Sequence, residues 1–108
     1  LPDGHAYALP RTHRMEIRSR ALELAGILPG DIVALELTDA AGCEPGDLVC
    51  AELHDDQTGT AQTIYRIWEP PYLLSASLSE STRRPLTLDQ APIRGRVVAL
   101  LRRYRSAA

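Results

Sequence analysis

The chain has 108 residues, of which 44% are hydrophobic and 24% charged, and its formal net charge is -2. This length and composition are typical of one globular domain and exclude a disordered tail, a collagen-like rod and a coiled coil. No apolar run reaches the ~20 residues that cross a bilayer, and the first residues do not have the pattern of a signal peptide. We therefore expect a soluble, cytoplasmic protein.

The ionisable residues limit the chemistry that this chain can perform. All twelve basic residues are arginines, so a mechanism that needs a neutral lysine is excluded from this segment. His5, His13 and His54 are scattered, and Cys43 and Cys50 do not have the spacing of a close metal pair. We therefore predict no metal site and no cofactor, with Cys50 as a small core residue and Cys43 in a loop.

The predicted elements are an arm followed by short strands. Residues 1–12 predict a linker or arm ahead of a domain at 13–108, because Pro2, Gly4 and Pro10 interrupt any regular pattern. Alternation predicts a strand at 15–18, and helix-forming residues predict one turn at 20–24. Apolar or alternating runs between turn residues predict further strands at 32–37, 48–53, 63–68, 72–76, 85–88 and 93–101. Such a series is typical of a mainly β fold of curved sheets.

Trp68 is the only tryptophan, and the chain has no phenylalanine. The core must therefore depend on Ile, Leu and Val. Side chains alternate along a strand, so Trp68 shares a face with Ile64 while Tyr65 lies on the other face. We expect a buried indole, the alternative being a half-exposed ring at a strand end.

Four segments together resemble a known family. They are GILPGD at 26–31, EPGDLV at 44–49, TIYR at 63–66 and IRGRVV at 93–98. Their order and spacing resemble the C-terminal domain of LexA, lambda-repressor and UmuD-type proteins, from about Met15 to about Tyr104. The resemblance implies a LexA/signal-peptidase-like fold of curved antiparallel sheets, of the β-clip type. In that family the domain dimerises a repressor and cuts its own linker with a serine and lysine dyad.

Both positions of that dyad are changed in this chain. The family's serine falls on Ala21, which has no nucleophile, and its lysine falls on Tyr65. A phenol with a pKa of about 10 is a poor base at neutral pH. Ser19 is the one candidate for a displaced nucleophile, but no base for it is evident, and the alternative is a surface hydroxyl. We therefore predict a degenerate peptidase in which Ala21 and Tyr65 mark the vestigial dyad.

The resemblance implies a function in transcription. We expect a catalytically inactive domain that dimerises a DNA-binding repressor of the phage or SOS type, with DNA bound through an N-terminal domain outside this chain. No membrane or metal is expected to take part. Two alternatives remain open: a self-cleaving serine peptidase with a displaced dyad, and a UmuD-like accessory subunit of a polymerase.

The last predicted strand is the candidate dimer interface. Its final part is apolar on both faces, which requires cover on both faces, and a domain of this size has a limited core. A second copy related by a two-fold axis can supply that cover. The residues predicted to hold the homodimer are Arg96, Val97, Val98, Ala99, Leu100 and Leu101. The alternative is an internal strand that is buried within its own subunit.

Overall fold

The computed structural model describes residues 12–78 and 83–101, which form a mainly β domain. Its strands are β1 (Thr12–Glu16), β2 (Ile32–Leu37), β3 (Leu48–Asp55), β4 (Thr60–Glu69), β5 (Tyr72–Leu74) and β6 (Ile93–Leu101). Two short 3-10 helices, η2 (Glu23–Ala25) and η3 (Ala40–Gly42), lie between strands. The strands form one antiparallel sheet in the order β1-β2-β6-β3-β4-β5. The mainly β prediction is therefore confirmed, as a single sheet.

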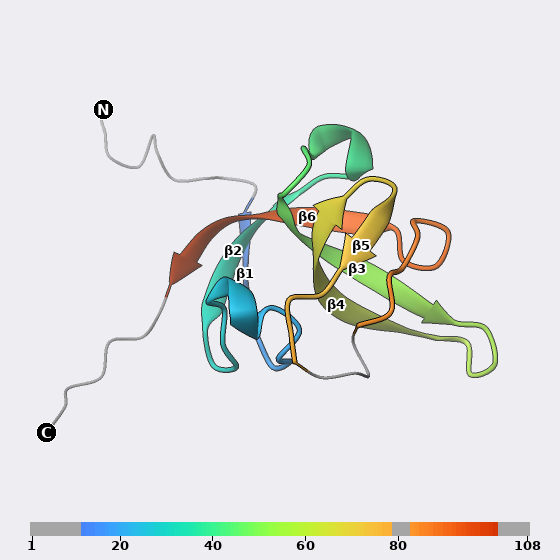
Figure 1. Ribbon diagram of the computed structural model, residues 1–108, viewed down its shortest axis with the longest axis horizontal. Helices are drawn as coiled ribbons and strands as arrows, with labels where there is room; N and C mark the ends of the chain where they lie inside the picture. Colours follow the sequence, from blue (N-terminus) through green and yellow to red (C-terminus); the bar gives the residue numbers. More distant parts are fainter. Residues whose placement is uncertain (1–11, 79–82, 102–108) are drawn as a thin grey trace, which may run out of the picture.

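The last strand of the chain lies in the middle of the sheet. Figure 1 shows β6 crossing the molecule between the β1–β2 pair and the β3–β4–β5 group. β6 pairs with β2 from Gly95 to Leu101, but it pairs with β3 only between Ile93 and Arg96. The two halves of the sheet are therefore joined through one strand.

Two turns of the same kind start β2 and β3. Each has the sequence Pro-Gly-Asp, with a positive φ of 95° at Gly30 and 92° at Gly46. The aspartate that follows accepts a hydrogen bond of 2.8 Å from the backbone N–H three residues earlier, through Asp31 in one turn and Asp47 in the other. Proline fixes the first corner of such a turn and glycine permits the second. The turn predicted at 44–47 is confirmed.

The sheet carries one hydrophobic cluster on each face. The first cluster contains Ile17, Leu22, Ile27, Val33, Leu35, Cys50 and Tyr65. The second contains Val49, Ala51, Ile64, Trp68, Leu73, Ala91 and Ile93. Successive residues of β4 contribute to opposite clusters, as strand geometry requires. The predictions that Cys50 is a core residue and that Trp68 shares a buried face with Ile64 are confirmed.

Two irregularities in β6 break the expected alternation of side chains. In register with β2, Leu35 lies opposite Val97 but Val33 lies opposite Leu100, so β6 has one extra residue in this interval. A second shift occurs where β6 pairs with Cys50 and Ala51. Such bulges bend a strand and increase its twist. Val97 and Leu100 therefore face the same side of the sheet, whereas simple alternation predicted opposite sides.

Several predicted elements have different limits. The strand expected at 15–18 ends at Glu16 and begins at Thr12, because pairing with β2 extends it toward the N-terminus. The helical turn expected at 20–24 is η2. The strand expected at 72–76 ends at Leu74, and the one expected at 85–88 is wrong, because only Leu86 forms an isolated bridge there. The predicted arm lies outside the described residues except for Thr12.

The buried indole has a direct spectroscopic consequence. Trp68 is 6% exposed and packs in the second cluster. Because it is the only tryptophan, we expect its fluorescence to be blue-shifted and weakly quenched by acrylamide in the native protein. Both properties should become water-like in denaturant. Water-like emission from the native protein would contradict this packing.

Candidate functional site

A cleft lies between the two distant ends of the curved sheet. Its volume is about 360 Å³. One wall comes from the end of β1 and the residues after it, and the other comes from β4; the lining residues are Met15, Glu16, Arg18, Ser19, Gln62, Thr63 and Tyr65. Because β1 is the first and β4 the fifth strand in the sheet order, only a curved sheet brings these two walls together. The cleft therefore contains two residues that the sequence singled out, Ser19 and Tyr65.

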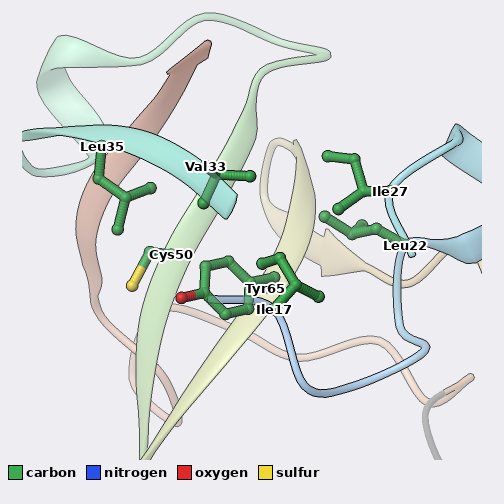
Figure 2. Packing of buried hydrophobic residues seen from close by; sticks show 7 residues of the cluster. All are labelled: Ile17, Leu22, Ile27, Val33, Leu35, Cys50 and Tyr65. Atoms are coloured by element: carbon green, nitrogen blue, oxygen red, sulfur yellow. The ribbon is translucent and has the colours of Figure 1, made fainter. Parts of the chain in front are cut away.

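Tyr65 is held between the cleft and the first hydrophobic cluster. It lies opposite Cys50 in the register of β3 and β4, and Figure 2 shows its ring beside Ile17 with the phenol oxygen directed toward Cys50. Burial, and to a lesser extent the charge of the Cys50 thiolate, raises the pKa of Tyr65 to about 12. The phenol is therefore protonated at neutral pH and cannot act as a general base there.

Ala21 is completely buried and lies outside the lining of the cleft. Its carbonyl oxygen accepts a hydrogen bond of 2.7 Å from the N–H of Ala76, and the N–H of Leu24 donates to the carbonyl oxygen of Ala76, also at 2.7 Å. These two bonds fix the backbone before η2 to the segment after β5. Ala21, which the sequence analysis predicted as a vestigial dyad position, is therefore a packed methyl group.

Ser19 does line the cleft, and no side-chain base among the described residues forms a hydrogen bond with it. Its Oγ accepts a hydrogen bond of 3.4 Å from the N–H of Ala21. A serine nucleophile needs a base that accepts its proton, and Tyr65, which lines the same cleft, is protonated at neutral pH. Ser19 therefore resembles the surface hydroxyl of the alternative interpretation more than a displaced nucleophile.

The predicted dimer strand has two distinct parts. Its first residue, Arg96, donates to Glu36 at 2.7 Å and has a longer ion pair of 3.9 Å with Asp47. Beyond Arg96, no strand in the described ranges pairs with the edge of β6 that faces away from β2. Along this edge, Val98, Leu100 and Leu101 are 37%, 41% and 40% exposed. The C-terminal part of β6 thus combines an open edge with apolar side chains.

The described residues show neither a membrane span nor a metal centre. Within 12–78 and 83–101 no helix is long and apolar enough to cross a membrane. The same ranges contain no group of three or more histidine, cysteine, aspartate or glutamate side chains placed to hold a metal ion. Both cysteines are free thiols, and Cys43 lies outside the strands, as predicted.

Sequence reasoning did not anticipate one buried charge. Arg66 is in the middle of β4 and is buried on the face of the second cluster. The signal was present in the sequence, because alternation places Arg66 between Ile64 and Trp68 on the apolar face.

A comparison with models of known protein families and with curated proteins gives no match for this chain.

The raised pKa of Tyr65 predicts a loss of stability at alkaline pH. Above pH 10 the unfolded chain releases the phenol proton while the folded chain retains it up to about pH 12. The free energy of unfolding therefore falls as pH rises through this window, by at most about 1.4 kcal/mol per pH unit for one proton. We expect Tyr65→Phe to remove this part of the fall. Urea denaturation between pH 8 and pH 11 checks it, since an identical slope in both proteins would contradict the assignment.

Proposed function

We propose that this chain is a dimerisation domain of a DNA-binding transcriptional repressor, built on a LexA-like scaffold that has lost its peptidase dyad. The DNA-binding domain would precede the chain, and the protein would act in the cytoplasm. The observation that carries the proposal is the C-terminal part of β6, an open strand edge with exposed Val98, Leu100 and Leu101. The order and spacing of the four family-like segments support the repressor role.

Pairing of two copies along β6 satisfies both the backbone and the side chains. An open edge presents unpaired N–H and C=O groups, which a second antiparallel strand can bind. Two copies of β6 related by a two-fold axis are antiparallel to one another, as this pairing requires. The same association covers the exposed side chains of Val98 and Leu100. One contact of this kind therefore pairs the backbone groups of the edge and also covers exposed apolar side chains.

The outer strand β1 is less suited to such pairing. β1 is an edge strand of the sheet, but three of its five residues, His13, Arg14 and Glu16, are exposed and polar or charged. Charged side chains on an edge discourage association with another strand. The apolar edge of β6 is therefore the better interface.

The state of the cleft supports loss of the peptidase activity. Ala21 supplies no nucleophile, Tyr65 remains protonated at neutral pH, and the full sequence contains no lysine that could replace the base. The three observations are independent of one another. Together they favour an interaction domain over the self-cleaving alternative.

Leu100→Glu tests the dimer directly. We expect the unmodified protein to sediment as a dimer, and we expect Leu100→Glu to remain folded and to weaken dimerisation at least about 30-fold, because a buried interface charge commonly costs ~2 kcal/mol or more. Circular dichroism verifies folding, and sedimentation equilibrium measures association.

Leu37→Glu is the matched control. Leu37 is a more exposed leucine, 59%, on β2 and outside the open edge. We expect this variant to dimerise as well as the unmodified protein. A monomeric unmodified protein at high micromolar concentration, or equal weakening by both variants, would rule out the β6 interface.

Restoring the two dyad residues tests the vestigial site. We expect Ala21→Ser with Tyr65→Lys to give slow self-cleavage of the full-length natural protein at best. A lysine at position 65 must be desolvated to act as a base, but the pocket there fits a phenol beside Cys50. Gel analysis after incubation at alkaline pH follows cleavage. Rapid cleavage by Ala21→Ser alone would show that Tyr65 does not occupy the base position.

A further inference from the structure

Arg66 is a buried cation on the face of the sheet opposite the cleft. It is 7% exposed and lies directly opposite the fully buried Val49 in the β3–β4 register. On its own strand, its neighbours on the same face are Ile64 and Trp68 of the second cluster. A guanidinium among apolar side chains is costly unless its charge and its donors are compensated.

The compensation available within the described residues is small. Arg66 donates from Nη1 to the carbonyl oxygen of Tyr65 at 2.8 Å, and its Nε has no hydrogen-bond partner. Arg20, Arg94 and Arg96 each form an ion pair with a carboxylate, whereas Arg66 forms none in the described ranges. Burial alone lowers its pKa, without an opposing contribution from a carboxylate. A guanidinium has five N–H donors, and of these the one on the buried Nε has no partner.

We propose that Arg66 is the centre of a binding site for an oxyanion, a phosphate or a carboxylate group. The planar guanidinium binds such groups with two parallel hydrogen bonds and neutralises its own charge in doing so. Arg66 lies just beyond the paired part of the β4 edge, because β5 pairs with β4 only from Ile67 to Glu69. Ser75, half-buried, follows β5 at this part of the edge. The site is separate from the β6 interface and does not depend on the proposed repressor role.

The test is a titration with inorganic phosphate and, separately, with acetate, at ionic strength held constant by sodium chloride. Trp68 shares the face of Arg66, so its fluorescence reports binding, and the thermal midpoint gives a second readout. We expect a saturable change in both. At ten times the dissociation constant, the ratio of folded to unfolded protein should rise about 11-fold. Saturation by phosphate only, by acetate only or by both identifies which oxyanion the site takes.

Arg66→Met and Arg94→Met separate the site from general salt effects. Both variants remove one positive charge, but Arg94 is exposed and bound to Glu52. We expect Arg66→Met to lose at least about ten-fold in affinity, as removal of a charged hydrogen bond implies, and Arg94→Met to bind like the unmodified protein.

If Arg66→Met does not fold, Arg66→Lys keeps the charge without the bidentate geometry and should show the same loss. No saturation by either anion in the unmodified protein would overturn the proposal. Equal loss in the Arg66 and Arg94 variants would overturn it as well.

Discussion

The pairing of β6 with two strands holds the whole sheet together. β2 occupies one edge of β6 through to Leu101, while β3 occupies the other edge only as far as Arg96. Without β6, the β1–β2 pair would have no hydrogen-bonded neighbour, and an isolated two-stranded pair is marginally stable at best. Gly95 permits the close approach to β2, since an added Cβ would lie 3.2 Å from the carbonyl oxygen of Glu36. The strand at the end of the sequence is thus the one on which the earlier strands depend.

The same strand shapes both candidate surfaces. It contains two bulges, which bend a strand, and the curved sheet places Tyr65 of β4 in one cleft with Ser19, which follows β1. Because β3 leaves β6 after Arg96, no strand of the described residues pairs with the rest of this edge of β6. An interface at Leu100 would therefore be continuous, through β6, with the strands that support the cleft. This connection between the proposed interface and the cleft follows from the order of the strands alone.

The sequence predicted the limits of a strand best where its hydrophobic pattern covers the same residues as its pairing with the neighbouring strand. The limits of β2 match the prediction because its apolar run lies between turn residues, and β6 has the predicted bounds within the described residues. β1 begins earlier than predicted because pairing with β2, and not hydrophobic alternation, makes His13 and Arg14 part of a strand. The bulge near Val98 depends on register with β2, which one strand's sequence does not encode. The sequence analysis named Tyr65 and Ser19 as candidate site residues. It did not predict that they line one cleft, because that depends on the curvature of the sheet.

Under the function that we propose, the residues at positions 21 and 65 suit a domain that does not need catalysis. A buried serine hydroxyl at position 21 would need a hydrogen-bond partner, whereas the methyl group of Ala21 needs none in its fully buried site. A neutral lysine at position 65 would have to be stripped of water, but the ring of Tyr65 contributes apolar area to the first cluster. Active sites commonly hold such groups at a cost in stability, which selection for activity maintains. If the domain serves association alone, as we propose, that cost has no benefit, and substitutions that improve packing at these two positions are favoured.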